Sequence, residues 1–216
     1  MPRVSQILIV VMLLIGIVIG HYVGYEMGYN KGKEVIGAAA TFTTIVTVMQ
    51  TPSQEVSISS QTVAIVPLLD KNYFTTLMNW LDRANVSIHV IMYVVKYDPK
   101  DPNDPVDQIL SKLVDAYKRG VDVRIVVDDE TRDSCPETLE FLQSQGIPVK
   151  LDESSGRTTH TKLVIIDDKV VFVGSHNWTE SALKYNHEAS MLIISSDIAE
   201  QFEEYFESIW SKGRSI

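Results

Sequence analysis

Cysteine is almost absent from this sequence of 216 residues, in which Cys135 is the single thiol. One thiol excludes a disulfide within the chain and excludes a zinc site built from several cysteines. The neighbouring Asp133 and Glu137 are acidic and disfavour a thiolate, so nothing around Cys135 supports a nucleophilic role. We interpret it as a structural thiol, and the redox compartment stays undetermined.

Positive charge is also scarce. The chain has 19 Lys and Arg against 28 Asp and Glu, which gives a net charge of -9. Residues 37–216 alone carry 16 positive and 26 negative side chains, so the acidity belongs to the main body of the chain. Such a domain repels polyanions at long range, which argues against tight non-specific binding of nucleic acid. A local basic site within the acidic surface is still compatible with these counts.

Charged residues are missing altogether from residues 4–25, and residues 7–19 are Ile, Leu, Val and Met apart from Gly16. A helix of that length spans about 33 Å, enough to cross the hydrocarbon core of a bilayer. We predict an N-terminal membrane anchor over residues 1–36, inserted through residues 4–25 as a single pass. The alternative is a cleaved signal peptide and a secreted protein, but no small-x-small cleavage site follows Ile19 directly.

Glycine recurs at every fourth position of the anchor, at Gly16, Gly20, Gly24, Gly28 and Gly32. On a helix this spacing makes a smooth stripe along which a second helix can approach closely, so it predicts self-association. Arg3 precedes the apolar stretch, while Lys31 and Lys33 follow it. The positive charges therefore leave the side of the membrane undecided.

Beyond the anchor, residues 37–62 are rich in Ser, Thr and Ala and read as a linker to a domain at residues 63–216. In that domain, short β-branched runs alternate with segments of helical spacing. The patterns predict strands at 63–66, 86–95, 121–127, 147–151, 162–166, 170–173 and 189–194, and helices at 73–81, 109–117, 139–145 and 198–210. This alternation indicates an α/β sandwich, in which helices flank a mixed β-sheet.

The segment from residue 160 to residue 188 concentrates side chains suited to phosphate chemistry. His160 and Lys162 are two residues apart, so in a strand both would project from one face. The imidazole supplies a nucleophile or a proton, and the ammonium neutralises a non-bridging phosphate oxygen. Ser175 and Asn177, at the end of the next predicted strand, offer a hydroxyl and an amide to the remaining oxygens. Glu188 is suited to holding an imidazole N–H and fixing its tautomer.

The spacing of His160, Lys162, Asp167, Gly174, Ser175 and Asn177 resembles the HKD motif of the phospholipase D superfamily. The strands that precede the motif and the closing helix, FESIW, also fit, so the resemblance covers residues 63–216. It points to the short single-motif branch that includes Nuc-like and Zucchini-like nucleases. Asp167 lies seven residues after His160, on the opposite face of a continuous strand, so we expect it and Gly174 to be structural.

The resemblance implies a two-step reaction through a phosphohistidine, in which the histidine of a second motif protonates the leaving group. Because this chain has one motif, it implies a homodimer with a shared active site. It implies no cofactor and no metal, since the Lys162 side chains of both subunits supply positive charge. The expected catalytic residues are His160, Lys162, Asn177 and Glu188, and the phosphate-binding residues are Lys162, Ser175 and Asn177.

The substrate is a phosphodiester whose class the sequence leaves open. The short length favours an endonuclease acting on DNA or RNA, of either strandedness. The anchor and the acidic surface favour a membrane-associated phospholipase D acting on phosphatidylcholine or cardiolipin. A catalytically inactive membrane scaffold is the third hypothesis, and the complete set of motif residues speaks against it.

Other residues receive structural interpretations. A lone histidine is usually an ordinary polar side chain, which is how we read His21, His89, His176 and His187, although His176 could also touch substrate. Asp128, Asp129 and Glu130 follow a predicted strand and read as an acidic loop rather than a metal site. Trp178 is expected in the core.

Overall fold

The computed structural model describes residues 63–101, 103–154 and 156–216. The predicted anchor, its glycine stripe, His21 and the linker lie outside the described residues and stay predictions. Within the described part of the chain, no helix is both long and apolar enough to cross a membrane.

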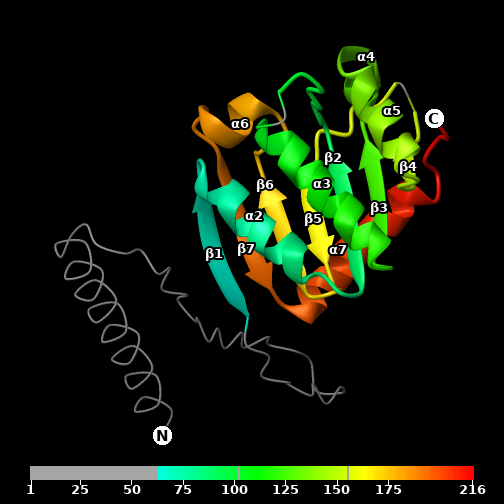
Figure 1. Ribbon diagram of the computed structural model, residues 1–216. Helices are drawn as coiled ribbons and strands as arrows, with labels where there is room; N and C mark the ends of the chain where they lie inside the picture. The colour runs from blue at the N-terminus through cyan, green and yellow to red at the C-terminus, as the bar shows by residue number, and fades with distance from the viewer. Residues whose placement is uncertain (1–62, 102, 155) are drawn as a thin grey trace, which may run out of the picture. The chain divides into compact units, whose positions relative to one another are not determined.

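A single mixed sheet of seven strands forms the centre of the domain (Figure 1), in the order β1-β7-β6-β5-β2-β3-β4. Strands β2, β3 and β4 are parallel, and every other neighbouring pair is antiparallel. The bounds are β1 Ala64–Leu69, β2 Ser87–Met92, β3 Asp122–Val127, β4 Val149–Leu151, β5 Lys162–Ile166, β6 Val170–Gly174 and β7 Ala189–Ile194.

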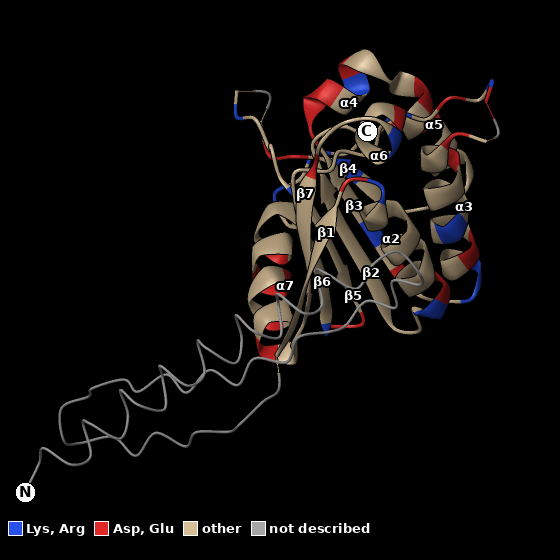
Figure 2. Cartoon of the chain, turned by 90° about the vertical axis from the view of Figure 1, so that its left-hand side faces the viewer, with Lys and Arg blue, Asp and Glu red and all other residues tan. Residues whose placement is uncertain are grey.

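Helices cover both faces of the sheet (Figure 2), with α2, α3 and α5 on one face and α7 on the other. Their bounds are α2 Asn72–Arg83, α3 Pro105–Lys118, α4 Asp129–Ser134, α5 Pro136–Ser144, α6 Glu180–Lys184 and α7 Ser196–Trp210. Strand β2 is buried along its whole length because it lies mid-sheet beneath helices on both sides. The larger apolar core lies under α2 and α3, and a smaller one lies under α7.

The predicted strands and long helices are all present, with ends displaced by a few residues. Strand β2, for example, ends at Met92 instead of Val95. Two short helices were missed, because each is too short to show a period. Helix α4 replaces the expected acidic loop, and the Asp128 carboxylate caps it by accepting a hydrogen bond from the Glu130 N–H at 2.9 Å. Helix α6 is capped in the same way by Thr179.

Candidate active site

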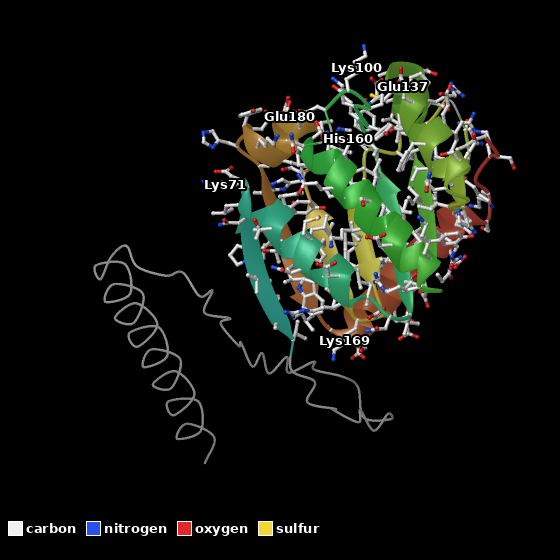
Figure 3. All side chains as sticks on the ribbon, viewed as in Figure 1. Lys71, Lys100, Glu137, His160, Lys169 and Glu180 are labelled. Atoms are coloured by element: carbon white, nitrogen blue, oxygen red, sulfur yellow. The ribbon has the colours of Figure 1, made fainter. Side chains whose placement is uncertain are left out.

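His160 lies just before β5, which begins at Lys162, and the side chains of both residues lie against the ring of Tyr93. A backbone contact also links the pair: the Lys162 Nζ donates to the His160 carbonyl oxygen at 2.8 Å. Lys162 is buried, with 6% of its surface exposed, whereas His160 is exposed at one end of the sheet (Figure 3). The imidazole therefore faces solvent, and the ammonium lies behind it.

Tyr93 joins these two side chains. Its ring centroid is 4.5 Å from that of the His160 imidazole, and the Lys162 Nζ lies 4.8 Å from the centre of the same ring. The backbone of Tyr93 is held on both sides, because its N–H donates to the Thr161 carbonyl at 3.0 Å and its carbonyl accepts from the Thr131 hydroxyl at 3.0 Å. The sequence analysis missed Tyr93, although an aromatic residue directly after a buried central strand is a recognisable signal.

Burial lowers the pKa of the Lys162 ammonium below the usual lysine value, and the carboxylates of Glu188 and Asp128 act in the opposite direction. The lysine is thus a partly desolvated cation with two acidic groups near it. A charge in such a site interacts more strongly with a phosphate than the same charge in water.

The backbone that leads into His160 is fixed by two buried carboxylates. Asp128 accepts from the Thr159 N–H at 2.6 Å, and Asp152 accepts from the Thr159 hydroxyl at 2.6 Å. Arg214 in turn donates to Asp152 at 3.2 Å and to Asp129 at 2.6 Å. The acidic stretch after β3 therefore positions the loop that carries His160, which sequence reasoning did not foresee.

The end of β6 and the start of β7 form a second wall of the candidate site. A side chain at Gly174 would overlap the backbone of Ser190 and Ala189, so a glycine is needed where these strands approach closely. The exposed Ser175 hydroxyl donates to the Glu188 carboxylate and accepts from the Ala189 N–H at 3.0 Å. This wall brings the side chains of Ser175 and Glu188, two of the predicted site residues, into contact.

Glu188 is held differently from the expectation. Its carboxylate accepts from Ser175 and from the Asn186 amide at 3.0 Å, and its backbone N–H donates to Asp70 at 2.9 Å. Among the described residues of this chain, no hydrogen bond joins Glu188 to His160, so the predicted tautomer-fixing contact is not formed within one subunit. The Asn177 side-chain oxygen is buried and has no hydrogen-bond partner in the described part of the chain.

His176 does not reach the site, which corrects the suggestion that it touches substrate. It is fully buried, stacks on Tyr73 with centroids 4.3 Å apart, and bonds to the Ser190 hydroxyl at 2.7 Å and the Asp70 carbonyl at 3.0 Å. Burial lowers the pKa of the His176 imidazole. Trp178 is also fully buried, in agreement with its expected core position.

Asp167 directly follows β5, at the opposite end of that strand from His160, and has a positive φ of 54° that aspartate tolerates in tight turns. Its carboxylate accepts hydrogen bonds from three consecutive backbone N–H groups, those of Asn85, Val86 and Ser87, the shortest at 2.8 Å. These bonds hold the connection between α2 and β2 in place, at the end of the sheet opposite His160.

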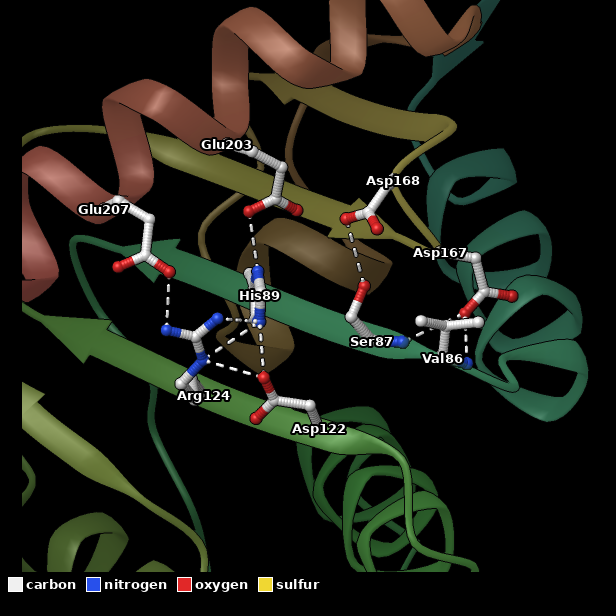
Figure 4. Close-up of polar contacts among 9 residues, drawn as sticks. All are labelled: Val86, Ser87, His89, Asp122, Arg124, Asp167, Asp168, Glu203 and Glu207. Carbon is white, nitrogen blue, oxygen red and sulfur yellow. Dashed lines mark hydrogen bonds and ion pairs between the residues drawn. The ribbon is translucent and has the colours of Figure 1, made fainter.

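His89 takes part in a second polar cluster, which fastens α7 to the sheet (Figure 4). Its Nδ1 is 2.6 Å from the Glu203 carboxylate, and its Nε2 is 2.7 Å from the Arg124 guanidinium, which also pairs with Glu207 at 2.6 Å. Because arginine can only donate, the His89 Nε2 accepts and the Nδ1 donates to Glu203. The exposed His187 lies 3.5 Å from Asp70.

Within the described residues, no group of three or more His, Cys, Asp or Glu is arranged to hold a metal ion. Cys135 is buried at the start of α5, and burial raises the pKa of its thiol.

Comparison with known proteins places this fold and site. Residues 77–210 match the family model described as the PLD-like domain of cardiolipin synthase. The chain therefore belongs to the phospholipase D-like family. This family is part of the phospholipase D superfamily, whose enzymes are phosphodiesterases.

Two relatives show the range of names within this family. The chain is 32% identical over 96 residues to the mitochondrial cardiolipin hydrolase of Xenopus tropicalis. This match covers 44% of this chain and 45% of that protein. It is 35% identical over 126 residues to a phospholipase D of Rickettsia felis, covering 58% of each chain. The matched segments thus span about half the length of these relatives.

Solved structures of similar fold include Nuc, a phospholipase D family member from Salmonella typhimurium, with a TM-score of 0.61 and 27% identity. That match covers 71% of this chain and 98% of Nuc. NucT from Helicobacter pylori shares the fold with a TM-score of 0.58 at 18% identity.

Proposed function

We propose that the protein is a phosphodiesterase that hydrolyses nucleic acid as an endonuclease, without a metal ion, through a phosphohistidine formed on His160. The observation that carries the proposal is the exposed His160 imidazole held beside the buried Lys162 ammonium by the ring of Tyr93. A nucleophile open to a large substrate, with a fixed cation behind it, is what attack on a phosphodiester requires.

In the first step, an imidazole nitrogen of His160 forms a bond to phosphorus, and the bond from phosphorus to the leaving oxygen breaks. The Lys162 ammonium, the Ser175 hydroxyl and the Asn177 amide bind the non-bridging oxygens as negative charge builds up on them. The leaving oxygen needs a proton, and the partner's His160 supplies it. In the second step that histidine takes a proton from water, the hydroxide attacks phosphorus, and the nitrogen–phosphorus bond breaks.

This scheme requires a second copy of the chain, and one surface is suited to receive it. Alternating residues of β1 and β7 point to the same side of the sheet as α7. Several of them are large, apolar and exposed: Ile65 is 37% exposed, Leu69 55% and Met191 38%. Phe202 of α7 lines a shallow apolar pocket on that side together with Ile198 and Gln201.

A second subunit that covers this surface buries exposed apolar side chains and approaches the end of the sheet that carries His160. Burial of such a surface is the usual driving force for a stable homodimer. A two-fold axis there would bring two copies of one motif together, in line with the single motif per chain.

Phospholipid hydrolysis is the second candidate function. It is favoured by the names of the relatives, mitochondrial cardiolipin hydrolase and phospholipase D, and by the apolar anchor predicted at residues 4–25. We place nucleic acid first because the pocket at His160 is small and mostly polar, about 180 Å³, and is too small to enclose acyl chains. In addition, the match to Nuc covers 98% of that chain.

The test uses the purified full-length protein in EDTA, with labelled single- and double-stranded DNA, RNA, and vesicles of phosphatidylcholine or cardiolipin. Cleavage of nucleic acid should persist in EDTA and disappear in His160→Ala, whereas His187→Ala, which removes an exposed imidazole outside the site, should keep it. Release of lipid headgroups with nucleic acid left intact would establish the second candidate instead. Loss of activity in EDTA that Mg²⁺ restores would contradict the metal-independent mechanism.

The shared site has its own test. When wild-type and His160→Ala chains are co-expressed in equal amounts, a site that needs both histidines leaves about one quarter of the activity, since only wild-type homodimers are complete. Chains that act independently would retain about one half. Measured activity per total protein separates the two arrangements.

A further inference from the structure

The polar pocket that His160 helps to line also contains side chains to which the reaction described above assigns no role. Its volume is about 180 Å³, and its lining includes Arg157, Thr158, Tyr205 and Lys212. One wall is the loop that leads into β5, and the other is α7 with the residues that follow it. Thr161 and Tyr205 connect the two walls, with their oxygens 3.4 Å apart.

Two cations in this pocket converge on one carboxylate. The Arg157 guanidinium pairs with one oxygen of Glu153, and the Lys212 Nζ is 3.8 Å from the other. The side chains of Arg157 and Lys212 are 72% and 65% exposed, whereas that of Glu153 is 27% exposed. The carboxylate is therefore flanked by two cations whose outer surfaces are open to solvent.

This arrangement is unusual for a domain with such an excess of acid. Residues 37–216 carry 26 negative and 16 positive side chains, so their average field repels polyanions. Ion pairs as exposed as these contribute little to stability, so replacing Glu153 by another anion costs little. A guanidinium and an ammonium together suit a phosphate group, which arginine can bind through two parallel hydrogen bonds.

We propose that Arg157 and Lys212 form a second phosphate subsite, which binds the phosphate next to the scissile one in a single-stranded nucleic acid. The Thr158 hydroxyl adds a neutral hydrogen bond, and the Tyr205 ring offers a face on which an adjoining base stacks. Glu153 acts as an internal counter-ion that the incoming phosphate displaces. The inference rests on the proposed nuclease function and concerns its substrate specificity.

Single-stranded nucleic acid fits this pocket better than a membrane lipid does. Cationic side chains that follow a phosphate backbone, combined with an exposed aromatic ring, are the usual means of binding single strands without sequence preference. Arg157 and His160 line the same small pocket, so a phosphate bound by Arg157 lies next to the phosphate under attack.

The experiment compares two substrates with the full-length protein. Bis(p-nitrophenyl) phosphate has one phosphodiester and no second phosphate, whereas a labelled single-stranded oligonucleotide has many. In Arg157→Ala and in Lys212→Ala, the ratio of kcat/KM for the oligonucleotide to kcat/KM for the small diester should fall about tenfold, the low end of the range for a charge-assisted contact, because both side chains are exposed. The salt dependence of oligonucleotide cleavage should weaken by about 0.7 in the log–log slope for each lost cation.

Glu153→Gln provides a variant of opposite sign, because it frees both cations, and the same ratio should rise severalfold at low salt. Lys169→Ala is the matched control. It removes one exposed cation in the β5–β6 connection, at the opposite end of the sheet from His160 (Figure 3), and should leave the ratio unchanged.

Ratios and salt slopes that stay at the wild-type values in both cation variants would overturn the subsite while leaving the proposed nuclease function intact. Variants that impair cleavage of cardiolipin vesicles but not of the oligonucleotide would overturn the subsite in the same way. A wild-type protein inactive on both the diester and the oligonucleotide would overturn the proposed function, and the subsite with it.

Discussion

Tyr93 is the residue whose replacement tests the architecture of the site most directly. Its ring touches the His160 imidazole on one side and the Lys162 ammonium on the other, with separations of 4.5 and 4.8 Å. The phenol has no part in the proposed reaction, so the ring acts by positioning. Tyr93→Ala removes both contacts, whereas Tyr93→Phe retains them.

The expected loss follows from the two contacts. An aromatic pair contributes about 0.5–1.5 kcal/mol, and a cation–π contact contributes about 0.5 kcal/mol when exposed and about 2 kcal/mol when desolvated. Lys162 is buried, so its contact belongs toward the upper end. If the transition state depends on both, kcat in Tyr93→Ala falls at least about tenfold, with a ceiling near 400-fold, while Tyr93→Phe stays within about threefold.

The assay is kcat and KM on bis(p-nitrophenyl) phosphate, with a thermal melt of each variant to establish that it is folded. The pH profile adds a reading that a merely structural role would not change, because an ammonium that has lost its ring partner titrates differently. Tyr117→Ala, on the outer side of α3, serves as the matched control. A folded Tyr93→Ala protein with wild-type kcat and pH profile would refute the positioning role.

Four further outcomes follow from the structure. Because burial lowers the pKa of the Lys162 ammonium, its charge lowers the stability of the folded protein below that pKa, and this cost is lost as pH rises through it. Lys162→Met should therefore abolish activity yet raise Tm at neutral pH. A lower Tm would contradict this reasoning. In the wild type, kcat/KM should decline on the alkaline side at a lower pH than an exposed lysine would give. Asp167→Ala leaves three backbone N–H groups without their carboxylate acceptor. It should lower the free energy of unfolding, measured in urea, by about 1–3 kcal/mol and keep kcat within about threefold of wild type. A loss of kcat at normal stability would instead assign Asp167 to catalysis. Gly174→Ala forces β6 and β7 apart and should cost about 1–3 kcal/mol of stability, so an unchanged melt would show that the strands can shift.

Lys162 illustrates why the site is not optimised for stability. A buried ammonium next to an exposed imidazole is costly in the folded state and useful in the reaction, because the desolvated charge acts strongly on a phosphate. The buried carboxylates of Asp128 and Asp152 hold the loop before His160 in place. One of these two carboxylates, Asp128, belongs to the stretch that the sequence analysis had interpreted as an acidic loop.

The sequence by itself determined the elements and the chemistry. Strands such as β3 and β5 and helices such as α3 and α7 follow from apolar periodicity, which records locally which side of a segment avoids water. The proposed reactive residues were recognisable because their spacing is short and fixed: His160 and Lys162, then Ser175 and Asn177. Short helices such as α4 and α6 escaped, since five or six residues do not establish a period.

Only the tertiary structure decided which distant groups meet. Tyr93 lies 67 residues before His160 and joins it because β2 and β5 are neighbours in the sheet, an order that periodicity does not encode. Lys212 reaches Glu153 because the end of α7 returns to β4, where Leu151 pairs with Arg214. His176 sits between two proposed site residues in sequence yet turns inward to Tyr73, because adjacent side chains can point to opposite sides of the backbone. Apolar periodicity specifies which surfaces must be buried, whereas the packing of the whole chain selects their partners and so completes the site.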